Sequence, residues 1–323
     1  MKVNTQYVLL AGAGVIIVGL IAGGIAYTQG EFQALAVTQS APDELQYIPR
    51  NATLVAYANV RDVMVSSFRD RLRELDLGFD GQQQFREETG IDLETDVESV
   101  IATLVPDVEE PSGLVLLNGQ FDAQRLESLA REHGSRVEEY SGRRLFTRVV
   151  DDAEVSMSLV ESGVLAVGAP GMVRGAIDLS GDDVDDNVTA NERLMGLMSQ
   201  VGGGNTAWAV ADFEGMDATL YVPEELLSQV PPIAAMAVSG RVNGGLSASL
   251  TVETRNEQSG QDLHVVVQGL VALARLQIES RPNLRGLLDS VQLVQAGNSV
   301  TLSFDLLPEI LDLAVPESRD TPP

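Results

Sequence analysis

One uncharged stretch near the start of the chain, LLAGAGVIIVGLIAGGIAY, constrains the fold more than any other feature. From Tyr7 to Tyr27 there is no charged side chain and no Asn, Gln, Ser or Thr. As a helix rising about 1.5 Å per residue, this run reaches about 31 Å, which is enough to cross the hydrocarbon core of a bilayer. We therefore expect a transmembrane helix at residues 7–27, with a tyrosine at each membrane boundary.

The charges on either side of this run predict its direction. Lys2 precedes it, whereas the first charges after it are Glu31, Asp43 and Glu44. Because positive residues favour the cytoplasmic side, residues 1–6 are expected to form a cytoplasmic stub. The rest of the chain is then extracytoplasmic, on the periplasmic side of a signal-anchor helix.

Two alternatives stay open for the same run. Gly24-Ile25-Ala26 fits the small-residue site of a cleaved signal peptide, although the run is longer than an ordinary signal-peptide core. Gly19 and Gly23 form a GxxxG pattern, which lets two membrane helices approach closely. The partner there would be another envelope protein or a second copy, but small residues are also common in membrane helices.

The glycines of this run do not fit a nucleotide site. Gly12 and Gly14 match the first two glycines of a dinucleotide-binding turn, but Ile17 stands at the position of the third. The turn also needs a preceding strand, and the sequence predicts none before Gly12.

Composition excludes several kinds of chemistry. The chain has 47 Asp plus Glu against 21 Lys plus Arg, for a net charge of −26, so its surface repels nucleic acid. Lys2 is the single lysine, which excludes a P-loop lysine and a Schiff-base lysine from the extracytoplasmic part. With no cysteine, thiol nucleophiles, disulfides and Cys-ligated metals are excluded as well.

Beyond a linker at residues 28–44, the pattern predicts a first α+β unit at residues 45–204. An apolar strand covers Thr53 to Val60, and another covers Gly113 to Phe121. Asp122 is placed to cap the next helix, which stops at Gly134. The segments expected to follow are the strands RVEEY, RRLFTRVV, EVSMSLV and GVLAVGA and the helices Gly171 to Leu179 and Asn191 to Val201.

A second, shorter unit is predicted at residues 205–315, before a polar, disordered tail at 316–323. TAWAVADF, from Thr206, matches TLVAYANV, from Thr53, in residue class at nearly every position. Strands IAAMAVSGRV and GLSASLTVET follow, then a helix from about Gly260 to Glu279 and a strand near Val291 to Gln295. The predicted fold is thus α+β: a transmembrane helix and two related antiparallel-sheet-plus-helix units, with helices on one face of the sheet.

An acidic loop, GDDVDDN, offers the one candidate metal site. Asp183, Asp185 and Asn187 have the spacing that opens an EF-hand loop. Val188 and Leu194 replace the turn glycine and the bidentate glutamate, which excludes an EF-hand. Two interpretations remain: a looser Ca²⁺ site, or a solvated loop capping the next helix.

No other pattern predicts a catalytic residue or a bound cofactor. His133 stands at a helix carboxyl end, where it suits capping, and His264 lies in an apolar stretch. The run Gly202-Gly203-Gly204 leads into a strand rather than a helix, so we interpret it as a helix terminator and hinge. Trp208, the single tryptophan, is expected in the core.

The order of segments between Leu45 and Phe213 resembles a known family. YIPRNATLVAYANVRDVMVSSF, ETGIDLETDVESV, GLVLLNGQFDAQRLESLAREHG, VEEYSGRRLF and VLAVGAPGMVRGAID look like an uncharacterised family of membrane-anchored bacterial ectodomains. The resemblance implies repeated α+β units and no established activity or site residues.

Together these patterns predict a single-pass membrane protein whose extracytoplasmic domain is not an enzyme and binds, senses or scaffolds in the cell envelope. Two alternatives stay open: a carrier or chaperone for an apolar ligand, and an envelope hydrolase using carboxylates or a metal.

Overall fold

The computed structural model describes residues 42–65, 86, 89–92, 94–106, 112–150, 153–181, 186–201, 203–214, 231–242, 246–278 and 289–306. The predicted membrane segment at 7–27 and the tail at 316–323 lie outside these residues. None of the helices in the described ranges combines the length and apolarity that a membrane crossing needs.

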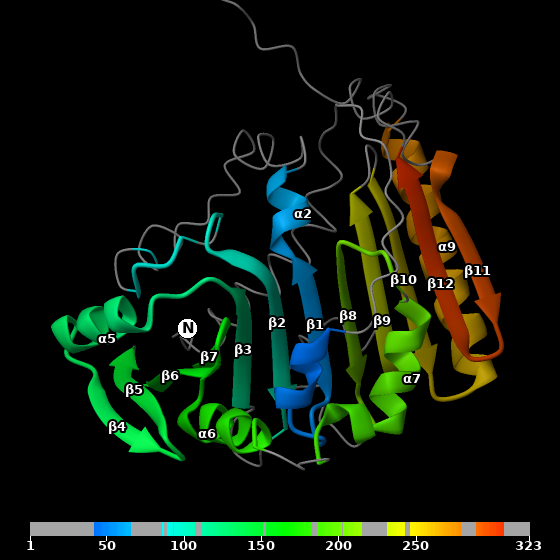
Figure 1. The fold of residues 1–323 in the computed structure, drawn as a ribbon. Helices are drawn as coiled ribbons and strands as arrows, with labels where there is room; N and C mark the ends of the chain where they lie inside the picture. Colours follow the sequence, from blue (N-terminus) through cyan, green and yellow to red (C-terminus); the bar gives the residue numbers. More distant parts are fainter. Residues whose placement is uncertain are drawn as a thin grey trace, which may run out of the picture.

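Across the described residues, twelve strands form one antiparallel sheet (Figure 1). Their order in the sheet is β11-β12-β10-β9-β8-β1-β2-β3-β7-β6-β5-β4. The strands are β1 Leu54–Asn59, β2 Val97–Val105, β3 Ser112–Gly119, β4 Arg136–Tyr140, β5 Arg143–Val150, β6 Ala153–Glu161, β7 Val164–Gly168, β8 Ala207–Asp212, β9 Ile233–Val242, β10 Leu246–Thr254, β11 Gln292–Ala296 and β12 Ser299–Leu306.

Local capping fixes where several of the helices begin. The Asp122 carboxylate accepts from the amides of Gln124 and Arg125, and the Asn191 side chain accepts from the Leu194 amide. Pro170 occupies the first turn of its helix, where a missing N–H costs nothing. The helices are the 3-10 helices η2 Asp43–Tyr47 and η3 Val188–Ala190 and the α-helices α2 Val60–Val65, α5 Ala123–Glu132, α6 Pro170–Leu179, α7 Glu192–Val201 and α9 Glu257–Ile278.

Helices lie on both faces of the sheet, which corrects the expectation of one covered face. Val55 and Tyr57 of β1 join one core cluster with residues of α6 and α7, and we call this side the front face. Ala56 and Ala58, which alternate with them, join a second cluster with Val63 of α2 on the back face. Figure 1 shows α6 and α7 in front of the strands and α9 behind β12.

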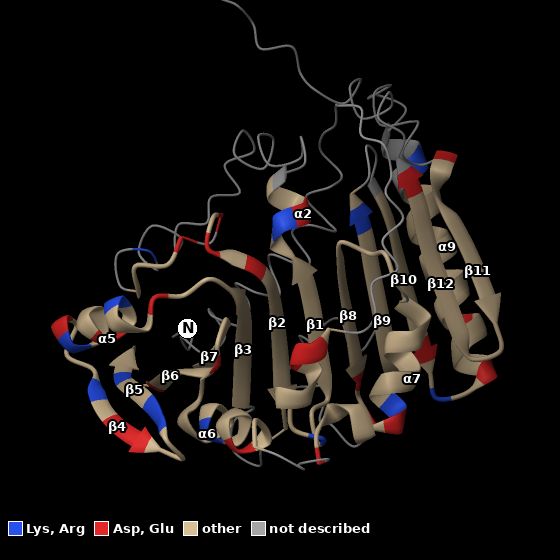
Figure 2. Ribbon diagram, in the orientation of Figure 1, with Lys and Arg blue, Asp and Glu red and all other residues tan. Residues whose placement is uncertain are grey.

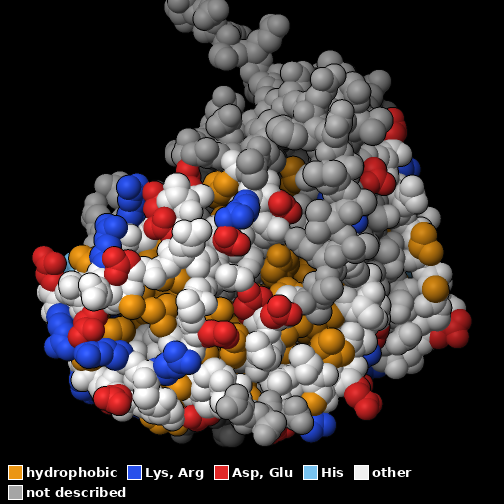
Figure 3. Space-filling view, viewed as in Figure 1, with side chains coloured by type: hydrophobic (Ala, Val, Ile, Leu, Met, Phe, Trp, Pro, Cys, Tyr) orange, Lys and Arg blue, Asp and Glu red, His pale blue; other side chains and the backbone are white. Residues whose placement is uncertain are grey.

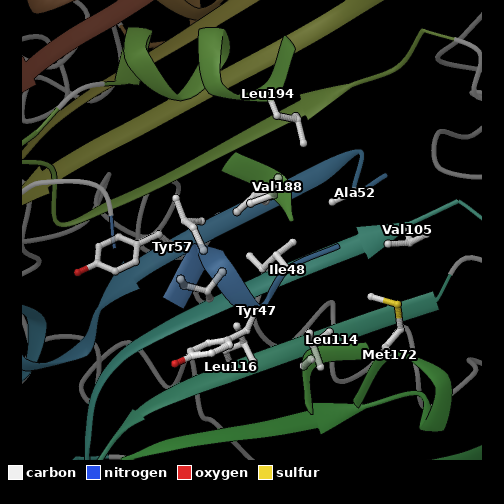
Figure 4. Packing of buried hydrophobic residues seen from close by; sticks show 14 of the residues in the cluster. Tyr47, Ile48, Ala52, Tyr57, Val105, Leu114, Leu116, Met172, Val188 and Leu194 are labelled. Atoms are coloured by element: carbon white, nitrogen blue, oxygen red, sulfur yellow. The ribbon is translucent and has the colours of Figure 1, made fainter. Parts of the chain in front are cut away.

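The front face holds the largest core. Tyr47 and Ile48 lie across the middle of the sheet, over Leu114 and Leu116 of β3 (Figure 4). Leu194 of α7 and residues of α6 complete this layer, and several of its side chains have no exposed surface. On the back face α5 contributes Leu126, which packs with Leu117 and Leu165.

The prediction of an α+β fold with antiparallel strands is confirmed. β1, β3 to β7 and β8 to β11 lie where the sequence predicted strands. Gly142 and Gly163, which have positive φ, form two of the turns between them. Two elements differ from expectation. β2 was not predicted, and α9 begins at Glu257 because Asn256 caps its first turn through the Ser259 amide.

Candidate functional site

The predicted Ca²⁺ loop is only partly within the described residues. Asp183 and Asp185 lie outside them. Asn187 is buried, and its side-chain oxygen accepts from the amide and the hydroxyl of Thr189, so it caps η3. Among the residues that the structure describes, no group of three or more acidic or histidine side chains could hold a metal ion.

The two histidines have separate surroundings. His133 follows α5 as its carboxyl-terminal cap, where its amide donates to the Leu129 carbonyl, as the sequence predicted. His264 is half-buried on α9, and its Nδ1 atom has no hydrogen-bond partner in the described part of the chain.

The glycine run and the tryptophan lie at the middle of the sheet. α7 ends at Val201, and Gly204, three residues before the start of β8, has a φ of 86°, which fits a helix terminator. Gly202 lies outside the described residues. Trp208 is buried as expected, and its ring stacks on Tyr57 with centroids 5.7 Å apart. This stack joins β8 to β1, which pair directly.

A polar cluster ties η2 to the front face. Glu44 accepts a hydrogen bond from the Asn118 amide group at the end of β3, and the Tyr47 hydroxyl donates to Glu161 of β6. Burial, and then the bond to Glu161, raise the pKa of Tyr47 far above its usual value. Burial likewise raises the pKa of Tyr57 to about 12. Both phenols stay protonated at neutral pH, so the cluster holds η2 in place rather than supplying a base or a nucleophile.

A second cluster ties α7 to the other half of the sheet. Arg193 lies 2.7 Å from Glu253 of β10 and 3.8 Å from Asp212 of β8. Gln200 donates to the same Glu253 side chain at 3.2 Å. Like the first cluster, this one joins a helix on the front face to the end of a strand, and every charge in it has an opposite partner.

The most unusual surface lies at the β11 end of the sheet. Four apolar side chains of α9 and one of β11 are exposed, and we call them the α9–β11 patch: Val265 (65%), Val266 (38%), Leu270 (60%), Leu273 (57%) and Val294 (57%). From Leu263 to Ala274 the helix carries no Asp, Glu, Lys or Arg, and neither does the chain from Ser290 to Phe304. Figure 3, which views the front face, shows orange side chains at the β11 end, and Figure 2 shows β11 without charge.

Sequence reasoning missed this patch, although a signal was present. Leu263 is buried against the sheet, and Val267 and Val271 on the same side are half-buried. The side of α9 turned away from the sheet is also apolar, at Val265 and Leu273. A helix that is apolar all round is typical of one covered on both sides, whereas the sheet covers α9 on one side only.

Comparison with known proteins shows a shared fold. No protein-family model and no curated protein sequence matches this chain. The crystal form III structure of TP0453 superposes with a TM-score of 0.50 at 9% identity, over 85% of this chain and 98% of that one. Crystal form IV of TP0453 gives a TM-score of 0.49 at 9% identity, over 85% and 98% of the two chains. At such identity the likeness shows the fold alone, and the resemblance to a family of membrane-anchored ectodomains stays a prediction.

Proposed function

We propose that this chain is a single-pass, membrane-anchored interaction module whose α+β domain lies outside the cytoplasm and docks through the α9–β11 patch. The observation that carries the proposal is the exposed, uncharged apolar side of α9 in a chain with a net charge of −26. Binding, rather than chemistry, is the role that such a surface serves.

Covering the patch is favourable for two physical reasons. Apolar surface removed from water contributes about 25 cal/mol per Å², so a partner that covers these exposed side chains gains free energy. The patch also carries no charge, so a partner covering it need not desolvate an ion. The net charge of −26 disfavours contact through acidic surface, so a neutral area is the favoured place for docking.

The anchor in this proposal is the predicted helix at residues 7–27. The chain enters the described domain at η2, and the bonds of Glu44 to Asn118 and of Tyr47 to Glu161 fix that entry point on the sheet. The linker at residues 28–44 then holds the domain close to the membrane. This tethering raises the effective concentration of the domain near neighbouring envelope proteins.

We also propose that the domain consists of two related units. Their strands follow the same order, β1-β2-β3-β7-β6 and β8-β9-β10-β12-β11, with the hairpin β4–β5 added to the first. β1 pairs with β8, and Ala56 lies opposite Ala209 at the centre of this pairing. Matching hydrogen bonds flank this point: the Asn59 amide donates to the Thr206 carbonyl and the Asp212 amide to the Thr53 carbonyl, both at 2.8 Å.

The proposed location is tested by thiol labelling, because the chain has no cysteine of its own. We expect a membrane-impermeant thiol reagent to label Glu132→Cys, at the exposed end of α5, in cells with a permeabilised outer envelope and an intact inner membrane. Lys2→Cys should react only after lysis. The opposite pattern would contradict the proposal.

The proposed docking is tested by the same chemistry. Leu273→Cys lies in the patch, and Val149→Cys is a matched control at the other end of the sheet, since Val149 is 66% exposed. In native membranes the thiol at 273 should react more slowly than the thiol at 149, whereas in dilute purified chain both should react alike. Equal rates in membranes would show that nothing covers the patch.

A further inference from the structure

The two edges of the sheet differ in a way that bears on what covers the patch. β4, at one edge, carries Arg136, Glu138 and Glu139 in a strand of five residues. β11, at the other edge, has the sequence QLVQA and carries no charge, no proline and no bulge in its pairing with β12. Natural sheets guard open edges with such features, because an unguarded edge pairs with another strand.

Both faces of the sheet are apolar beside this unguarded edge. Val294 pairs with Thr301, and Thr301 pairs with Thr251. Thr251 in turn pairs with Ala237, a residue of the front-face core. Val294 therefore lies on the front face. On the back face α9 contacts β11, β12 and β10 and turns Leu270 and Leu273 outward. An occupant that adds a strand to β11 would therefore cover apolar surface on both faces at once.

We propose that this occupant is a second copy of the chain. The two β11 strands pair antiparallel across a two-fold axis, which extends the sheet through both subunits and brings their α9 helices together behind it. The proposal rests on the docking function above and names its partner. A two-fold contact uses the same surface on both subunits and closes after two, so it does not propagate into a filament.

The middle of the molecule already shows such a joint. β1 and β8 pair antiparallel with residues 54–58 opposite 211–207, so that Ala56 faces Ala209 at the centre. Uncharged side chains surround this joint, with Tyr57 stacked on Trp208. Pairing of β11 with its own copy would repeat the same arrangement at the open end of the sheet.

The encounter of two copies is favoured by their shared anchor. The net charge of −26 opposes contact with anionic headgroups and with a second copy alike, so charge does not choose between them. Two copies anchored by the predicted helix at residues 7–27 share one membrane plane, which raises the concentration of each near the other. Residues 307–323, which follow β12, lie outside the described residues, and their deletion is one arm of the test.

The test counts subunits in the full-length chain. Chains labelled at Glu132→Cys, far from the patch, are reconstituted in liposomes at increasing surface density, and single-molecule photobleaching counts the labels in each particle. We expect dimers. Leu270→Glu and Val294→Glu should each raise the density needed for dimers by about tenfold or more, because a charge would be buried in the contact. Val149→Glu, at an equally exposed apolar residue, should leave the dimer unchanged.

Several results would overturn the proposal. Monomers at every density would do so, as would dimers that persist in both patch variants but disappear in Gly19→Leu/Gly23→Leu, which would place the contact in the membrane segment. Dimers that appear only after deletion of residues 307–323 would show that the chain covers its own patch. In the first two cases slow thiol labelling at 273 in native membranes would leave the docking function standing with another occupant, whereas a patch covered by residues 307–323 would overturn the docking function as well.

Salt gives an independent check on the same contact. Two chains of net charge −26 repel each other, and raising the salt from about 0.01 M to about 0.15 M shortens the screening length from about 30 Å to about 8 Å. An apolar contact opposed by this repulsion should strengthen with salt. Weakening would indicate attraction between charges and would contradict the proposed contact.

Discussion

The two halves of the sheet are filled by side chains of different size. In the first half, β2, β3, β5 and β7 bury large residues completely. In the second half, β8 buries Trp208 and Val210, whereas the buried residues described in β9, β10 and β12 are mostly alanines. The first set contains Ile101, Leu114, Leu116, Leu145 and Leu165, and the second contains Ala234, Ala235, Ala237, Ala248 and Val300.

The edges follow the same division. β4 carries charged residues whose partners lie in the same chain, since Glu138 pairs with Arg174 of α6 and Arg136 with Glu154 of β6. β11 carries none, and the helix beside it exposes apolar side chains. We infer that the β4 edge pairs Arg136 and Glu138 within the chain, whereas the β11 edge is completed by contact with another molecule.

The largest expected effect comes from emptying the core of the first half. Leu116→Ala removes a side chain that is 1% exposed and is expected to lower the free energy of unfolding by about 2–5 kcal/mol. Leu263→Ala, between α9 and the sheet, should lower the free energy of unfolding by less, because the neighbours of Leu263 on α9 are partly exposed. Urea unfolding of the monomeric chain measures both. Equal losses would mean that the two halves are equally well filled.

A smaller effect is expected where a strand of the first half ends. A Cβ atom at Gly119 would lie 1.9 Å from the Asp96 carbonyl oxygen, a backbone atom, so Gly119→Ala should cost about 1–3 kcal/mol. The second half has Thr254 at the corresponding place, with room for its side chain to donate to the Asn298 carbonyl. Gly171→Ala in α6 is the control, because nothing lies within 4 Å of its added atom. A fall in urea midpoint for Gly171→Ala as well would remove the steric explanation.

The smallest expected effect is the acid response of the charged edge. A hydrogen bond from Arg174 lowers the pKa of Glu138 below its ordinary value of 4.5. Because this pKa is lower in the folded state, ionised Glu138 stabilises the fold at pH values above 4.5. This stabilisation is lost as the pH falls through the folded-state pKa. Glu138→Gln should therefore be less stable than the parent chain at neutral pH and equal to it in acid. An unchanged difference between the two at both pH values would contradict this assignment.

Short-range patterns predicted much of the fold. The meander from β4 to β7 alternates residue types between turn signals, and Asp122 and Gly134 mark the ends of α5 correctly. β2 was missed because its sequence, VESVIATLV, is buried on both sides and lacks the alternation of a half-exposed strand. Period alone also does not say on which face of a sheet a helix packs, so the expectation of one covered face was wrong.

The candidate site depended on information that local sequence does not hold. The bonds from Glu44 to Asn118 and from Tyr47 to Glu161 join residues 74 and 114 positions apart. The patch has a local signal in the apolar residues of α9, but its exposure follows from the position of the helix at the end of the sheet. Only the tertiary arrangement shows that one side of α9 has no partner among the described residues.

The central claim is that the β11 edge, and not the β4 edge, receives a second copy. Hydrogen exchange of the backbone amides in the full-length chain, reconstituted in liposomes at low and at high surface density, tests it most directly. We predict that the outward amides of β11 exchange more slowly at high density, because they become bonded to the partner strand, and that the amides of β4 exchange at the same rate at both densities. Equal exchange of β11 at both densities, or slowing at β4 instead, would contradict the account.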